Sequence, residues 1–174
     1  SLYSSSDKGT RDYLYGGDRA GGRYYGTLAT VANGGSDFDP RYNPRFAYQT
    51  AIQINPFIKI SGFEFFGLME FVSNGNDAVG GDFTQLGLEG LYRFGNAEQW
   101  YFGGRYNTVS GETTSAGSTR EISRVNIGGG WFMTNNVLVK LEYMNQEYSG
   151  AGFANSRFQD GQFNGIVLEA VIGF

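Results

Sequence analysis

Apolar and polar residues alternate with a period of two through most of the chain. In the last stretch, Ile166, Leu168 and Ile172 fall on one face, whereas Glu169 falls on the other. This period predicts a β-strand with one apolar face. A soluble β-sandwich shows the same alternation along a single strand, so one strand does not distinguish the fold classes.

The same pattern predicts eight strands of about 10 to 15 residues, each long enough to cross a bilayer at a tilt, which takes about 9 to 11 residues. The first of them alternates poorly. The eight predicted strands are Gly22–Ala32, Arg45–Ile54, Phe57–Val72, Phe83–Phe94, Trp100–Val109, Arg120–Thr134, Val137–Tyr148 and Gln162–Phe174.

The predicted connections alternate between short and long. The short ones are Asn55-Pro56, Gly95–Gln99 and Asn135-Asn136, and the long ones are Asn33–Pro44, Ser73–Asp82, Ser110–Ser118 and Gly150–Gly161. Membrane barrels have tight periplasmic turns and longer external loops. If Phe174 ends on the periplasmic side, every short turn lies there too. We therefore predict an all-β fold: a transmembrane antiparallel up-and-down β-barrel, with about eight strands in this chain.

Aromatic residues gather near the predicted strand ends. Those near the short turns are Phe57, Phe94, Trp100, Tyr101, Phe102, Trp131, Phe132 and Phe174; those nearer the long loops are Phe71, Tyr106, Tyr148 and Phe163. Two such girdles are typical of membrane barrels, in which aromatic rings lie at headgroup depth. The alternative interpretation is that they are ordinary core residues.

Charged residues fall on the face opposite the apolar stripe, and we predict that this face lines the lumen. A lipid-facing Arg or Lys near mid-bilayer would cost about 2 to 4 kcal/mol. Lys59 breaks the phase of its strand, and a bulge near Ser61-Gly62 would restore it. The predicted lumen-facing residues are Arg45, Glu64, Glu70, Glu89, Arg93, Arg105, Arg124, Lys140, Glu142 and Glu169.

These ten residues comprise five bases and five acids. Two interpretations remain open. In a narrow eight-stranded barrel the side chains fill the interior and must pair. In a wider pore they line water, and a mixed wall gives weak ion selectivity.

The composition excludes several kinds of chemistry. The chain has no Cys and no His, so zinc sites built on those residues, thiol catalysis and His-based triads are absent, and we predict neither an enzyme nor a cofactor. Asp37-Phe38-Asp39 and Asn74-Gly75-Asn76-Asp77 lack the spacing of a calcium loop and are interpreted as solvated turn residues. Gly128-Gly129-Gly130 indicates close backbone packing or sheet curvature.

Charge and hydropathy limit the partners. The net charge is −4 with a pI near 4.8, which argues against nucleic-acid binding. No apolar run is long enough for a membrane helix, and no signal peptide begins at Ser1. We expect a mature or trimmed form if the protein is exported. Residues 1–21 are polar and Gly-rich and are not assigned to a strand; residues 22–174 form the predicted barrel.

The closing strands resemble the C-terminal end of porin-type outer-membrane proteins, including the phosphate-selective porin O/P group. The segments that carry this resemblance are Arg124-Val125, Gly129–Gln146, Val167–Phe174, Gly17–Tyr25 and Leu91–Gly95. Those porins have 16 to 18 strands and are about twice this length or more. The resemblance implies that this chain is a C-terminal half or a shortened relative. The Arg/Lys cluster of phosphate-selective pores has no clear counterpart.

Two functions follow as hypotheses. The first is a porin-like channel of the bacterial outer membrane for passive diffusion of small solutes, with weak ion selectivity. The second is a closed eight-stranded barrel with a structural or adhesive role through its external loops. The expected partners are outer-membrane lipid, the barrel-assembly machinery, which would recognise the last strand ending at Phe174, and other outer-membrane proteins.

Overall fold

The computed structural model describes residues 1–5, 46, 48–75, 80–112, 116–155 and 158–173. These residues form an all-β, antiparallel, up-and-down sheet. The elements are β1 (Leu2–Ser5), β2 (Gln49–Ile54), β3 (Phe57–Ile60), β4 (Phe63–Asn74), β5 (Asp82–Phe94), β6 (Trp100–Glu112), β7 (Arg120–Thr134), β8 (Val137–Ser149), the 3-10 turn η2 (Ala151–Phe153) and β9 (Gln162–Ile172). Within these ranges, no helix has the length and apolar character needed to cross a membrane.

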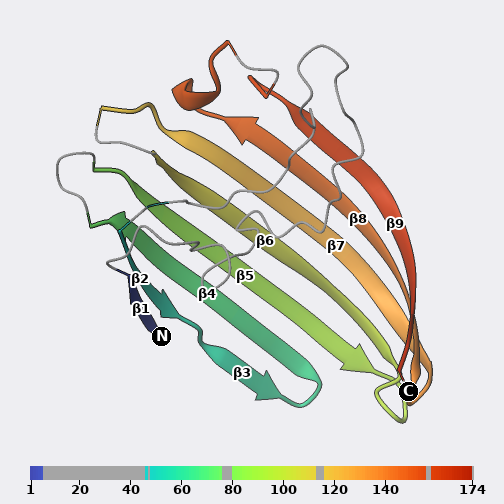
Figure 1. Cartoon of the computed structure of the whole chain (residues 1–174). Coiled ribbons are helices and arrows are strands. Elements are labelled where there is room, and N and C mark those ends of the chain that lie inside the picture. Colours follow the sequence, from blue (N-terminus) through green and yellow to red (C-terminus); the bar gives the residue numbers. More distant parts are fainter. Residues whose placement is uncertain (6–45, 47, 76–79, 113–115, 156–157, 174) are drawn as a thin grey trace.

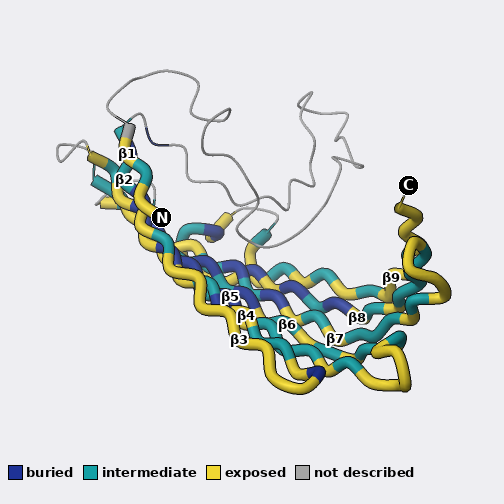
Figure 2. Tube along the Cα trace, turned by 90° about the horizontal axis from the view of Figure 1, so that it is seen from below, coloured by how far each residue is buried: buried dark blue, intermediate teal, exposed yellow. Residues whose placement is uncertain are grey.

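From β4 to β9, each strand pairs with the next one along the chain (Figure 1). The sheet is strongly curved, so one face is concave and the other convex (Figure 2). Within the described residues it does not close, because β1 and β9 are its two edges and do not pair with each other. The short turns all lie at one end of the sheet and the long connections at the other. We call these the short-turn end and the long-loop end.

The period-two pattern located the last five strands well. The predicted strands from Phe83, Trp100, Arg120, Val137 and Gln162 correspond to β5 through β9, and β6 extends further than predicted, to Glu112. The connections between them, 95–99, 113–119, 135–136 and 150–161, alternate short and long as predicted. The predicted strand Gly22–Ala32, the loop Asn33–Pro44 and Phe174 lie outside the described residues. Part of the unassigned N-terminal segment forms β1.

The prediction of a turn at Asn55-Pro56 is wrong. β2 and β3 both pair with β4 in one unbroken register, with Ile54 opposite Met69 and Phe57 opposite Phe66. The chain therefore runs straight through Pro56, whose carbonyl oxygen accepts a hydrogen bond of 2.8 Å from the Gly67 amide. Proline has no N–H, so only the reciprocal ladder bond is missing. The predicted strand Phe57–Val72 is accordingly two strands, β3 and β4.

The actual turn is Ser61-Gly62, where a bulge was predicted. Ile60 pairs with Phe63, which leaves a two-residue loop. Both loop residues have positive φ, 45° at Ser61 and 82° at Gly62. That combination defines the type I′ turn, whose twist matches the twist of the flanking strands. The turn also resolves the phase of Lys59, because Lys59 lies opposite Glu64 across the hairpin.

An apolar cluster covers the concave face at the long-loop end. It contains Phe46, Ala51, Val72, Phe83, Val109, Ile122, Tyr148 and Phe153, all buried. Phe153 and Phe158 come from the 150–161 connection, and their rings contact the ring of Tyr148 at 5.8 and 5.2 Å between centroids. This packing occupies only part of the concave face and leaves the short-turn half uncovered by the cluster.

Candidate functional site

The charged residues predicted to share a face do so. Cross-strand registers from β4 to β9 place nine of them on the concave face: Glu64, Glu70, Glu89, Arg93, Arg105, Arg124, Lys140, Glu142 and Glu169. Arg45, the tenth, lies outside the described residues. That this face lines a lumen stays a prediction.

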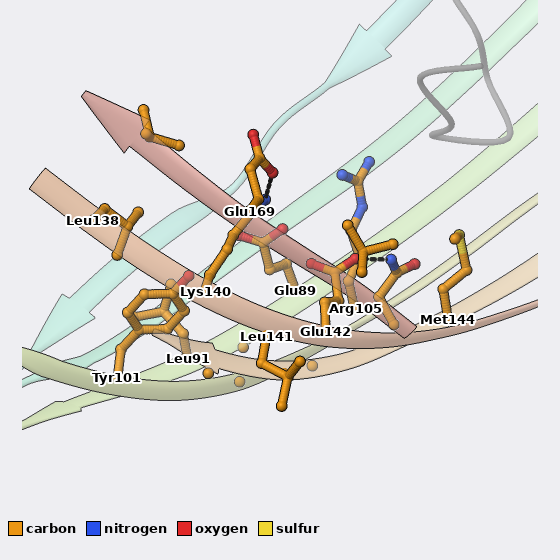
Figure 3. A pocket seen from close by; sticks show the side chains of 18 of the residues that line it. Glu89, Leu91, Tyr101, Arg105, Leu138, Lys140, Leu141, Glu142, Met144 and Glu169 are labelled. Carbon is orange, nitrogen blue, oxygen red and sulfur yellow. Dashed lines mark hydrogen bonds and ion pairs between the residues drawn. The ribbon is translucent and has the colours of Figure 1, made fainter. Parts of the chain in front are cut away.

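The short-turn half of the concave face is hollowed. A depression of about 690 Å³ is lined by residues of β5 through β9. Figure 3 shows Glu89, Arg105, Lys140, Glu142 and Glu169 on one side of the strands, with Leu141 pointing to the other side. Five strands thus supply charged groups to one space.

Glycines make the floor of this hollow. Gly103 on β6 lies opposite Gly128 on β7, and both line the depression. A Cβ atom on Gly128 would come within 2.5 Å of the Leu141 carbonyl oxygen. The next concave position of β7 is Gly130, and a Cβ there would meet the Tyr101 ring at 2.3 Å. The hollow therefore exists because these positions carry no side chain, and the Tyr101 ring lies across Gly130.

Ion pairs surround the hollow. Lys140 Nζ lies 2.7 Å from Glu169 Oε2, between directly paired residues of β8 and β9. Glu64 Oε1 accepts from both Lys59 Nζ, at 2.8 Å, and Arg93 Nε, at 2.9 Å. The Arg93 guanidinium also lies 5.4 Å from the centroid of the Phe132 ring, a cation–π contact that spans from β5 to β7.

The centre of the hollow is less fully paired. Asn126 Nδ2 donates to Glu142 Oε1, and an Arg124 guanidinium nitrogen contacts the Met144 sulfur. Glu89 and Arg105 are directly opposite each other on β5 and β6. Among the described residues, neither forms an ion pair or a side-chain hydrogen bond. Both are half-buried, so each presents a charged group to the hollow.

Polar side chains, most of them uncharged, separate the hollow from the apolar cluster. Gln85 Nε2 donates to Asn107 Oδ1 at 2.9 Å, and Gln146 Nε2 donates to the Tyr148 hydroxyl at 2.7 Å. Glu70 lies beside Gln85 and is buried, at 4% exposure. The concave face therefore changes from charged, through polar, to apolar toward the long-loop end.

The convex face has the opposite character. Its exposed large apolar residues include Ile54, Ile58, Phe63, Met69, Phe71, Leu88, Tyr92, Phe102, Ile127, Leu141, Ile166 and Leu168. Ile166 and Leu168 are 74% and 73% exposed. Charged residues of the convex strand faces, such as Asp82, Glu121 and Glu147, lie only near the long-loop end. The apolar residues thus form a band.

The band runs obliquely across the strands. Following paired residues from Phe71 in β4 leads to Ser149 in β8. On the convex face of β8, however, the apolar residue nearest the long-loop end is Tyr143, six residues before Ser149. At the other boundary, Phe63 leads to Leu141, while the apolar residues of β8 continue four residues further, to Val137. Both boundaries therefore slope in the same direction.

The slope can be expressed as an angle. Strands rise about 3.3 Å per residue and lie about 4.8 Å apart, so drops of four to six residues over the four or five steps to β8 or β9 incline the band by about 30° to 45°. Along β4 the band covers the nine residues from Phe63 to Phe71.

The predicted aromatic girdles divide between the two faces. Phe94, Trp100, Phe102 and Trp131 lie in the convex band near the short turns, and Phe71 and Tyr106 lie in it nearer the long loops. Phe57, Tyr101, Phe132 and Phe163 are on the concave face instead, and Tyr148 belongs to the buried cluster. The alternative of core packing thus applies to Tyr148, and for the concave residues an interfacial position is not supported.

Sequence reasoning missed the glycine floor. The run Gly128-Gly129-Gly130 was visible, but its opposition to Gly103 depends on strand register. In the described part of the chain, no group of three Asp or Glu residues is arranged to hold a metal ion. Comparison with protein-family models, curated proteins and solved structures found no match for this chain.

Proposed function

We propose that this chain forms part of the wall of a bacterial outer-membrane β-barrel that conducts small solutes with weak ion preference. The observation that carries the proposal is the oblique apolar band on the convex face, opposite a charged and hollowed concave face. In this proposal the convex band contacts lipid and the concave face lines water.

The inclination of the band supports the membrane part of the proposal. A bilayer imposes two parallel boundaries on whatever crosses it, and strands of membrane barrels tilt by about 35° to 45°. Apolar boundaries on such a barrel must therefore cross the strands obliquely, as they do here at about 30° to 45°. A soluble sheet packed against a second layer has no reason to keep two parallel oblique boundaries on the same face.

The concave face supports the conducting part. Its charged residues are of both signs, which favours weak selectivity over strong preference for anions or cations. Lys140 pairs with Glu169, whereas Arg105 forms no ion pair with a described residue. A charge without a partner is tolerated where it contacts water and is costly where it does not. The half-buried Arg105 therefore suits a hydrated lumen.

The apolar cluster at the long-loop end favours the second candidate, a closed structural barrel. Phe46, Phe153 and their neighbours fill that part of the concave face. If the same packing extended across the closed barrel, no aqueous path would remain, and the external loops would carry the function.

Planar-bilayer conductance separates the two candidates. The native full-length polypeptide, folded into lipid, is expected to give open-channel currents with a small reversal potential in a salt gradient. Silence across salts and voltages, from protein shown to be inserted by protection from protease, would reject the channel and leave the closed barrel. Recovery of the folded protein only in the aqueous phase, with no association with lipid vesicles, would reject both.

A further inference from the structure

We infer that the glycine-floored hollow is a binding site for a small zwitterion, a solute of the amino-acid type with one carboxylate and one ammonium group. The inference rests on the proposed function, because it names the class of solute that would pass along this face. The hollow, of about 690 Å³, lies within the range of small-molecule sites.

The charge inventory of the hollow favours a dipolar ligand over a net ion. Its lining contains Glu89, Glu142 and Glu169, together with Arg93, Arg105, Arg124 and Lys140. Arg93 pairs with Glu64, and Lys140 pairs with Glu169. Glu142 accepts a hydrogen bond from Asn126, and Arg124 contacts Met144. Glu89 and Arg105 supply one further charge of each sign, so the lining favours a ligand that carries both charges over a ligand with a net charge.

Glu89 and Arg105 supply the two recognition groups. They are cross-strand partners on β5 and β6, yet they form no ion pair with each other or with other described residues. A guanidinium matches the two oxygens of a carboxylate, and a carboxylate accepts from an ammonium group. A zwitterion could engage both residues at once, with Glu142 beside them as a second acceptor.

The glycine floor of the hollow leaves Glu89 and Arg105 accessible to a ligand. Gly103 and Gly128 carry no side chain, so a ligand that lies among the charged residues of the hollow can approach the backbone there. The Tyr101 ring lies across Gly130 and also lines the hollow. The glycines and the Tyr101 ring thus shape the floor, and the charged residues stand around it.

The test compares glycine with glycolamide, which has the same atomic composition but no charge. Fluxes of both are measured in vesicles that contain the full-length protein and its variants Arg105→Gln, Glu89→Gln and Lys59→Gln. Wild-type glycine flux should saturate and exceed glycolamide flux. Each of the first two variants should lower the glycine-to-glycolamide ratio by roughly threefold to tenfold, since one charge-assisted contact is lost.

Lys59→Gln is the control, because Lys59 carries a concave-face charge but does not line the hollow; its flux ratio should equal that of the wild type. An equal ratio in all four proteins would overturn the inference while leaving the channel intact. If neither solute crosses, the channel proposal fails, and saturation-transfer NMR on the detergent-folded protein decides the site separately. A glycine signal that Arg105→Gln abolishes supports it, and no glycine signal in the wild type rejects it.

Discussion

The indole rings of Trp100 and Trp131 stack on the convex face, with centroids 4.9 Å apart and planes 8° from parallel. The two residues are direct cross-strand partners on β6 and β7. They are also the only tryptophans of the chain. Intrinsic tryptophan fluorescence therefore reports on one location, the edge of the apolar band near the short turns.

This location leads to a depth prediction. In lipid vesicles the tryptophan emission should be quenched by lipids brominated high on the acyl chain more than by lipids brominated near its end, because the pair would lie close to the headgroups. A matched protein with Trp131→Phe should keep the same depth profile. Equal quenching by aqueous iodide before and after mixing with vesicles would contradict a membrane position for this face.

A second prediction concerns the neighbours Lys140 and Leu141. The chain has no cysteine, so single cysteines can be introduced without background. Cysteines replacing Leu141 and Ile172 should resist a water-soluble thiol reagent in membranes, because these residues are on the convex face. Cysteines replacing Lys140 and Glu169 should react, because they line the hollow. The four cysteines should react at similar rates in denaturant, which is the control. Similar rates at all four positions in membranes as well would reject the assignment of the faces.

The alternating pattern was enough to locate β5 through β9, because each of these strands keeps a stripe of apolar residues on its convex face through most of its length. It failed at Pro56 for a physical reason. Proline between two apolar stretches is typical of a turn. At an edge position of a sheet, however, proline can still accept a ladder hydrogen bond through its carbonyl, and its missing N–H removes only one bond. The positions of Lys59 and Glu64 indicated the correct turn, because a two-residue turn at Ser61-Gly62 places both charges on the same face of the sheet.

The third prediction tests this strand. Gly67 lies opposite Pro56, and a Cβ on Gly67 would come within 2.7 Å of Pro56 Cγ. Gly67→Ala should therefore destabilise the protein by about 1 to 3 kcal/mol, the usual cost of overpacking. Urea unfolding in detergent micelles, followed by tryptophan fluorescence, measures the change.

Pro56→Ala provides the matched control. It removes the ring and returns an amide donor to the ladder, so the double variant Pro56→Ala/Gly67→Ala should recover most of the lost stability. Additive effects of the two substitutions, with no coupling between them, would mean that the Pro56 ring does not lie against Gly67.

The fourth prediction concerns the turn at Ser61-Gly62. Asparagine tolerates positive φ better than serine, so Ser61→Asn should stabilise the hairpin by about 0.5 kcal/mol. Gly62→Ala should destabilise it, because a Cβ there would lie 2.6 Å from the Arg93 carbonyl oxygen. The same urea titration measures both, and a Gly62→Ala protein as stable as the wild type would contradict the turn.

The charged face of the candidate site was predictable, and its shape was not. Charges such as Arg105 and Lys140 have to avoid the apolar stripe, so their common face follows from their position in each strand. The hollow depends on Gly103 lying opposite Gly128. The two proposed recognition groups come together because Glu89 lies opposite Arg105. Both are matters of register between strands, which alternation within a strand does not determine.

The two edges of the sheet bear on how such a protein would reach a membrane. β1 pairs with β2 only from Gln49 to Ile52, and within the described residues the outer sides of β3 and β9 have no strand beside them. Hydrocarbon offers no hydrogen-bond partner to a backbone amide or carbonyl, and each one stranded there costs several kcal/mol. Strand-by-strand entry into lipid would thus be unfavourable at every stage. If the chain is part of a membrane barrel, insertion and the completion of the strand ladder would have to happen together, as a single cooperative event.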